Sequence, residues 1–122
     1  MSQLILIVDD NENNRKLARD VLEFAGFETV EATGGVEGVA LAMEQRPDLV
    51  LMDIRMPDLN GTEALKMLRE DSRTAEIPIV ALTSSTMRGD EARFLKEGFD
   101  GYLAKPISVR EFPDQVRGFL RE

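Results

Sequence analysis

The sequence predicts one α/β domain in which five parallel strands alternate with five helices in a doubly wound sheet. Short apolar runs alternate along the 122 residues with segments whose apolar residues recur at helical spacing. This alternation is typical of parallel sheets whose strands are joined by right-handed helical crossovers. Single domains most often contain about 100 to 150 residues, so we expect one domain spanning residues 1–122.

The five predicted strands share short runs rich in leucine and β-branched residues. They are Leu4 to Val8, Thr29 to Glu31, Leu49 to Met52, Ile79 to Leu82 and Gly101 to Ala104. The first run has no polar alternation, as expected of a central strand that is covered on both faces. The second is the weakest of the five.

Helices are predicted between these strands from the spacing of apolar residues. In chain order the markers are Leu17, Val21 and Leu22, then Val36, Val39, Ala40 and Met43, then Leu65 and Leu68, then Phe94 and Leu95, and finally Phe112, Val116, Phe119 and Leu120. Gly26 and Gly98 are placed to end the first and fourth helices, because glycine adopts the left-handed C-cap conformation without strain. Pro47 should end the second helix.

The start of the last helix carries two conflicting signals. Ser108 and Glu111 have the spacing of a capping box, which would open the helix at Ser108. Pro113 lies just beyond the first turn of such a helix, so it should distort the start or move it one or two residues later.

Composition excludes several classes of function. Asp and Glu outnumber Lys and Arg by 23 to 15, and no basic run offers a stripe for nucleic acid. The chain has no cysteine, which excludes disulfides and thiol chemistry, and no histidine, so any phosphohistidine donor must lie on another molecule. Without a signal peptide or a long apolar run, we expect a cytoplasmic protein that does not enter the membrane.

Polar residues that follow the predicted strands indicate the position of a site. Asp9 and Asp10 follow the first strand, Asp53 follows the third, and Thr83 and Lys105 close the fourth and fifth. Ligands of open parallel sheets bind at the carboxyl ends of the strands, beside the point where strand order reverses. Three carboxylates at such a point need a cation between them, so the pattern predicts a site for a divalent metal and an anion.

Each of these residues also has an ordinary structural explanation. Asp9 and Asp10 alone would be solvated loop residues about as often as ligands, and a lone Thr83 or Lys105 is more often a capping or surface residue. The combination with Asp53 favours the site.

Four ordered motifs resemble the receiver domain of two-component response regulators. They are Leu6 to Asn11, Leu51 to Gly61, Ala81 to Thr83 and Leu103 to Pro106, and the resemblance covers residues 4–120. Met87 to Glu91 and Lys105 to Ser108 further resemble single-domain regulators of the cell-division or chemotaxis type, and receivers attached to hybrid histidine kinases. The resemblance implies a flavodoxin-like sheet with strand order 2-1-3-4-5.

The resemblance also implies roles for the residues of the site. Asp53 would be the phosphoacceptor, and Mg²⁺ would be bound by Asp9, Asp10, Asp53 and the backbone carbonyl of Arg55. An aspartate can act as the nucleophile towards phosphorus if the incoming charge is neutralised. Lys105 would pair with one phosphoryl oxygen, and Thr83 would donate a hydrogen bond to another.

A second group of residues would transmit or tune the signal in the family. Thr83 and Tyr102 form the expected switch, and the Lys105–Pro106 peptide bond is expected to be cis. Arg55, Ser84 and Ser85 occupy positions that tune phosphate lifetime. Ser84 stands where the family commonly has a small apolar residue such as alanine.

We therefore expect a Mg²⁺-dependent phosphoacceptor that takes a phosphoryl group from a sensor histidine kinase or histidine phosphotransfer protein. It would catalyse only its own phosphorylation and dephosphorylation at Asp53. Because no effector domain follows Glu122, output should be protein binding at the fourth helix, fifth strand and fifth helix, by a monomer or a weak phosphorylation-dependent dimer.

Two alternatives remain at this point. The chain would also fit a receiver module cut from a hybrid histidine kinase. A phosphohydrolase with an aspartate nucleophile is disfavoured, because such enzymes usually place a general acid two residues after the nucleophile, where Arg55 stands.

Overall fold

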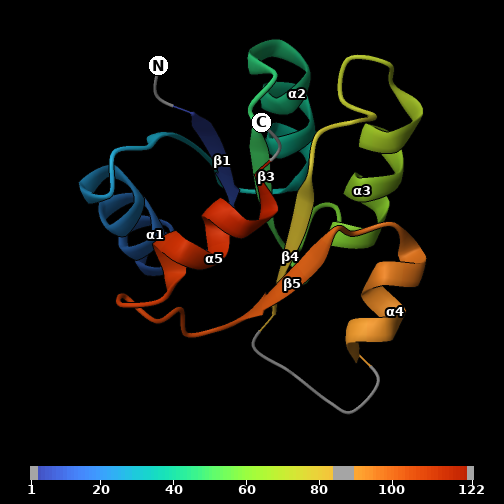
Figure 1. The fold of residues 1–122 in the computed structure, drawn as a ribbon. Helices are drawn as coiled ribbons and strands as arrows, with labels where there is room; N and C mark the ends of the chain where they lie inside the picture. Colours follow the sequence, from blue (N-terminus) through green and yellow to red (C-terminus); the bar gives the residue numbers. More distant parts are fainter. Residues whose placement is uncertain (1–2, 84–89, 121–122) are drawn as a thin grey trace.

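The computed structural model of the chain describes residues 3–83 and 90–120. A five-stranded parallel sheet lies at its centre, in the order β2-β1-β3-β4-β5 (Figure 1). The strands are β1 (Leu4–Val8), β2 (Glu28–Ala32), β3 (Leu49–Asp53), β4 (Ile79–Thr83) and β5 (Gly101–Ala104). The predicted fold class and strand order are confirmed.

Helices cover both faces of this sheet. They are α1 (Glu12–Phe24), α2 (Gly35–Gln45), α3 (Gly61–Glu70), α4 (Asp90–Glu97) and α5 (Phe112–Phe119). The apolar residues of α1 and α5 join one buried cluster, and those of α2, α3 and α4 join the other. This arrangement is the doubly wound architecture that the alternation of strands and helices predicts (Figure 1).

Strand β1 is the centre of both clusters. Leu6 and Val8 face the cluster of α2, α3 and α4, whereas Ile5 and Ile7 face the cluster of α1 and α5. All four side chains are fully buried, which explains why this run shows no polar alternation. Each such burial contributes about 1.5 to 3 kcal/mol to folding.

Glycines end two helices as the sequence predicts. Gly26 follows α1 with φ of 101°, and Gly98 follows α4 with φ of 117°. Both values lie in the left-handed region that residues with a β-carbon rarely adopt. A third glycine, Gly101 at the start of β5, faces the ring of Phe119 so closely that a β-carbon would overlap it.

The start of α5 differs from the capping-box expectation. The helix begins at Phe112, and Glu111 rather than Ser108 is its N-cap. Ser108 still accepts a hydrogen bond from the backbone N–H of Glu111, but within a turn that precedes the helix. Pro113 occupies the first turn, where its missing N–H needs no partner, and the helix therefore starts later than Ser108 would place it.

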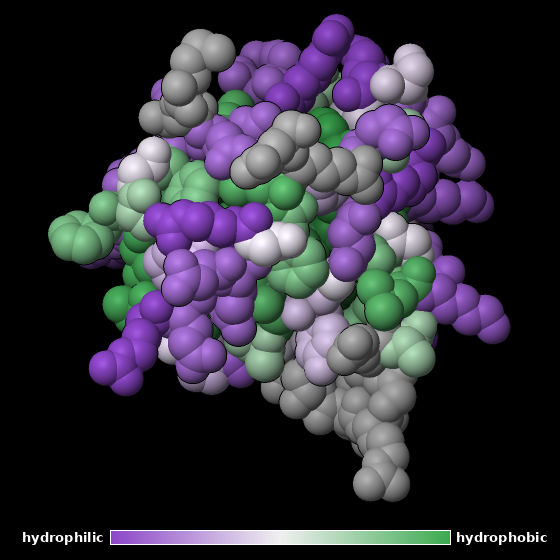
Figure 2. Space-filling view, in the orientation of Figure 1, coloured by the Kyte–Doolittle hydropathy of each residue, from purple (hydrophilic) through white to green (hydrophobic). Residues whose placement is uncertain are grey.

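Most of the surface in view is hydrophilic, and hydrophobic side chains emerge between the charged ones over α1 and α5 (Figure 2). Phe24, at the end of α1, is 96% exposed. Among the described helices, none combines the length and the apolar character of a membrane span.

Candidate functional site

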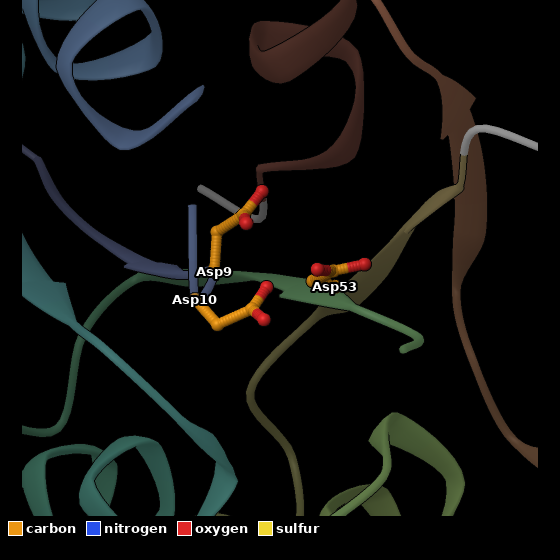
Figure 3. Close-up of side chains that lie close together, drawn as sticks. All are labelled: Asp9, Asp10 and Asp53. Carbon is orange, nitrogen blue, oxygen red and sulfur yellow. The ribbon is translucent and has the colours of Figure 1, made fainter. Parts of the chain in front are cut away.

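The ends of β1 and β3 bring the three predicted acidic residues together. Val8 pairs with Met52, so Asp9 and Asp53 follow at the same level on adjacent strands. One carboxylate oxygen of each of Asp9, Asp10 and Asp53 lies within 4.8 Å of the others, and Figure 3 shows the three side chains side by side. The crevice lies where strand order reverses, between β1 and β3.

The three carboxylates differ in their access to solvent. Asp9 is 1% exposed and Asp53 is 6% exposed, whereas Asp10 is an exposed residue. The site therefore combines two buried acids at its base with one acid at its mouth.

Burial and charge act on Asp53 in the same direction. Removal from water and, second, the nearby charge of Asp9 both raise the pKa of Asp53, and the net result of all its contacts is a pKa of about 6. Lys105 and the backbone N–H of Arg55, which donates to Oδ1 of Asp53 at 3.2 Å, oppose this increase in pKa. The carboxylate is thus ionised at neutral pH, but in surroundings that disfavour its charge.

Lys105 reaches both buried acids from the end of β5. Its Nζ lies 2.7 Å from Oδ2 of Asp9 and 3.3 Å from Oδ1 of Asp53. The backbone N–H of Lys105 donates to the carbonyl of Thr83, and the Lys105–Pro106 peptide bond is cis. The side chain is only 13% exposed, so its charge is held against the two carboxylates.

One oxygen of the site has no hydrogen bond. Among buried side-chain N and O atoms in the described part of the chain, Oδ2 of Asp9 alone lacks one. Nζ of Lys105 lies 2.7 Å from this oxygen, which is close enough for an ion pair. The angle between the two groups, and not their distance, therefore falls outside hydrogen-bond geometry. The oxygen therefore keeps a lone pair available for a cation.

The residues of this crevice fit a hard divalent cation. Mg²⁺ prefers oxygen ligands, keeps several waters and is often held by only one or two carboxylates. Asp9, Asp10 and Asp53 supply oxygen only, and the exposed position of Asp10 leaves room for water. The acidic cluster is thus able to hold Mg²⁺.

Two further residues of the predicted site lie on β4 and β5, with Tyr102 level with Ala81, two residues before the end of β4. Thr83 ends β4, next to β3, and is 7% exposed. Tyr102 of β5 is half-buried, and its ring centroid lies 6.1 Å from that of Phe94 on α4. Ser84 and Ser85 lie outside the described residues.

Sequence reasoning missed two residues that hold the loops of the site. Asp58, in the loop after Asp53, accepts hydrogen bonds from the backbone N–H groups of Gly35 and Val36 and so caps α2. Arg15 of α1 donates to the carbonyl of Asp9 at 2.8 Å. The partners of Asp58 lie more than 20 residues away in sequence, and an arginine in a first helical turn gives no signal of its target.

Fold and site together define a doubly wound α/β domain with an acidic crevice, able to hold Mg²⁺, at the carboxyl ends of its strands. The family model of the response regulator receiver domain matches residues 5–117. The chain belongs to this family, and it is a receiver domain of two-component response regulators.

Relatives of known name support this membership over nearly the whole chain. The polar-differentiation response regulator DivK of Brucella anthropi is 43% identical over 120 residues, which are 98% of each chain. The DivK protein of Brucella ovis is 42% identical over the same share of each chain.

Solved structures show the same fold. The chemotaxis response regulator CheY4 of Vibrio cholerae matches with a TM-score of 0.92 and 29% identity, covering 98% of this chain and 100% of that one. The receiver domain of the sensor histidine kinase PA1611 of Pseudomonas aeruginosa matches with a TM-score of 0.88 and 33% identity, covering 98% of each. That structure has a magnesium ion coordinated in its active-site cleft.

Proposed function

We propose that residues 1–122 act as one cytoplasmic receiver domain that accepts a phosphoryl group on Asp53 from a phosphohistidine of a partner protein. The donor would be a sensor histidine kinase or a histidine phosphotransfer protein. The observation that carries this proposal is the position of Asp53, which is buried at the carboxyl edge of the sheet with Lys105 3.3 Å from its carboxylate.

The proposed transfer needs little from the protein beyond position and charge. An oxygen of Asp53 attacks phosphorus, the P–O bond forms, the P–N bond of the donor breaks, and the released histidine nitrogen keeps the bonding electron pair. Nζ of Lys105 stabilises negative charge on a phosphoryl oxygen as a compact point charge. Thr83 would donate a hydrogen bond to a second phosphoryl oxygen.

Mg²⁺ is the proposed cofactor, held by Asp9, Asp10, Asp53 and the backbone carbonyl of Arg55. When bound, it neutralises charge on the transferring group and orients that group. Support comes from the three clustered carboxylates and from the magnesium ion in the related Pseudomonas receiver. The reaction is self-modification rather than turnover of an external substrate, with Arg55, Ser84 and Ser85 tuning the lifetime of the phosphoryl group.

Output is proposed to be protein binding at the surface of α4, β5 and α5, by a monomer or a weak phosphorylation-dependent dimer. Movement of Thr83 towards the phosphoryl group would free space for Tyr102 to turn inward. The contact between Tyr102 and Phe94 supports this route, because it links β5 to α4.

The test is direct labelling of the whole chain. Incubation with Mg²⁺ and a small phosphoryl donor should add one phosphoryl group by intact mass, and hydroxylamine should remove it, as expected of an acyl phosphate. A label that survives hydroxylamine would place the phosphoryl group on a hydroxyl and contradict the proposal.

A further inference from the structure

The side chain of Arg15 links α1 to β2 and to the loop that contains Asp9 and Asp10. Its Nη1 donates to the carbonyl oxygen of Asp9 at 2.8 Å, and its Nε lies 3.3 Å from Oε1 of Glu31 on β2. The other oxygen of Glu31 accepts from Arg19 of α1 at 3.0 Å. Arg15 is 12% exposed, so this planar fork is held inside the protein.

Asp9 is fixed at nearly every polar atom it has. Its N–H donates to the carbonyl of Ala32, and its Oδ1 accepts from the N–H of Asn11. With the bond from Arg15 to its carbonyl, only Oδ2 is left to face Lys105 and a cation.

The carbonyl that Arg15 holds has a special place in the chain. It belongs to the planar peptide unit that joins Asp9 to Asp10, so its direction fixes ψ of Asp9 and constrains φ of Asp10. Asp10 is exposed, and its side chain is therefore aimed by its backbone rather than by surrounding packing.

We infer that Arg15 is a positioning residue for Mg²⁺ binding, which aims the Asp10 carboxylate by holding the Asp9–Asp10 peptide, with Glu31 as its anchor. This inference rests on the proposed function, because it assigns Arg15 a role at the same metal site. The bond to a carbonyl leaves the carboxylates themselves free, whereas Lys105 contacts them directly.

A positioning role and a purely electrostatic effect predict opposite changes in Mg²⁺ affinity when Arg15 is replaced by an uncharged residue. Removing a positive charge near three carboxylates should tighten the binding of a cation, because repulsion between the two cations is lost. Removing a residue that orients a metal ligand should weaken the binding of Mg²⁺. Residues that hydrogen-bond to metal ligands typically contribute about 10 to 100-fold to metal affinity.

The experiment titrates Mg²⁺ into the isotope-labelled full chain and follows the backbone amide shifts of Asp9 to Asn11. Arg15→Met should raise the Kd for Mg²⁺ about tenfold or more, and Arg15→Lys should raise it too, because one ammonium does not reproduce the planar fork. Arg19→Met is the matched control, since Arg19 shares Glu31 and α1 but does not bond to the Asp9 carbonyl. It should change the Kd by less than about twofold, because Arg19 bonds to Asp20 and Glu31 and, among the described residues, not to Asp9 or Asp10.

Three outcomes separate the possibilities. Unchanged or tighter binding in both Arg15 variants would overturn the positioning role. If Arg15→Met is unfolded by circular dichroism, Arg15→Lys alone decides, and a wild-type Kd in that variant would overturn the inference. Asp10→Asn serves as the reference: if it leaves Mg²⁺ binding intact, the metal site itself is wrong, whereas loss of binding in Asp10→Asn alone rejects only the role of Arg15.

Discussion

For the proposed phosphoryl transfer, Asp53 must stay ionised in surroundings that favour its protonated form. Burial is the larger cause of its raised pKa, and the charge of Asp9 adds to it. Lys105 offsets part of the unfavourable free energy of ionising Asp53, and a cation between the three acids would offset more. Crowded negative charge of this kind favours the binding of a cation.

The first prediction concerns the phosphoacceptor. Asp53→Asn should abolish phosphate uptake from Mg²⁺ and a small phosphoryl donor, because an amide is nearly isosteric with a carboxylate but is a poor nucleophile. Intact mass gives the readout, and circular dichroism should show an unchanged fold. Full labelling of the variant would move the acceptor to another residue.

The second prediction is a pH dependence of stability in the metal-free protein. The pKa of Asp53 is about 6 in the folded state against an ordinary value of 3.8, so the folded state binds more protons between these pH values. The free energy of unfolding should therefore fall as pH rises from about 4 to about 6, through the contribution of this group. Asp71 acts outside this window, because Arg73 lowers its pKa to about 2.

Urea unfolding in EDTA across this pH range measures the effect. Asp53→Asn removes the titrating group, so the difference in unfolding free energy between variant and wild type should grow in favour of the variant as pH rises. A difference that stays constant with pH would show that Asp53 titrates normally.

The third prediction separates charge repulsion from metal binding. Asp10→Asn removes one of three crowded negative charges, so it should raise the melting temperature without metal. It should also lose the increase that Mg²⁺ gives the wild type, since a ligand of the folded state stabilises by mass action. Calorimetric melting with and without Mg²⁺ is the measurement, and a wild-type Mg²⁺ increment in the variant would place the metal elsewhere.

At the scale of elements, one arginine binds the connection from α3 to β4 and the connection from α4 to β5. Arg69, near the end of α3, donates to the carbonyls of Ala75, Ile77 and Gly98. It also pairs with Asp100 at 2.7 Å, and the same carboxylate oxygen accepts from the N–H of Ile79 at the start of β4. The connections before β4 and β5 are thus held by a single guanidinium.

The fourth prediction follows from these hydrogen bonds of Arg69. Arg69→Met should lower the free energy of unfolding by about 3 kcal/mol, because several acceptors lose a charged donor at once. Arg73→Met is the matched control, because Arg73 lies four residues on and is half exposed. It pairs with Asp71 two residues away and donates a weak hydrogen bond to the sulfur of Met43, so its loss should cost about 1 kcal/mol or less. Equal losses in urea unfolding would show that Arg69 is no more than a surface residue.

The fifth prediction tests how the signal leaves the site. Thr83→Ala should still accept phosphate at Asp53 but should fail to transmit it to α4 and β5, because the hydroxyl that would follow the phosphoryl group is gone. Amide chemical shifts of residues 90–97 and 101–104, with and without beryllofluoride, give the readout. Shift changes equal to those of the wild type would mean that the route does not pass through Thr83.

At the scale of the whole molecule, the sheet and its main site could be predicted from the sequence because both rest on local patterns. Buried strands show as uninterrupted apolar runs, and residues after parallel strands must meet at one edge, so Asp9, Asp10, Asp53 and Lys105 could be placed together. The contacts of Arg15, Asp58 and Arg69 could not be predicted in this way, because each of these residues binds backbone groups, and Arg15 and Arg69 bind an acidic side chain as well. Any residue supplies such groups, and sequence patterns do not mark them.

Competition between the capping-box spacing and Pro113 explains why α5 starts later than Ser108 alone predicts, in the direction that Pro113 predicts. Ser108 and Glu111 have the spacing of a capping box, but Pro113 is better placed in a first turn than in a second one. The position of α5 over the sheet decides between the two possible helix starts. Phe112 and Val116, which are buried in the core, anchor α5 in that position.

The direction of β1 decides from which side the chain enters the sheet. β1 begins at Leu4, and it ends beside Asp9 and Asp53, so its start lies at the opposite end of the sheet from the crevice (Figure 1). A reporter or a second module attached ahead of β1 therefore enters from the side away from Asp53. Such a fusion through a short linker should leave access for a partner protein unobstructed.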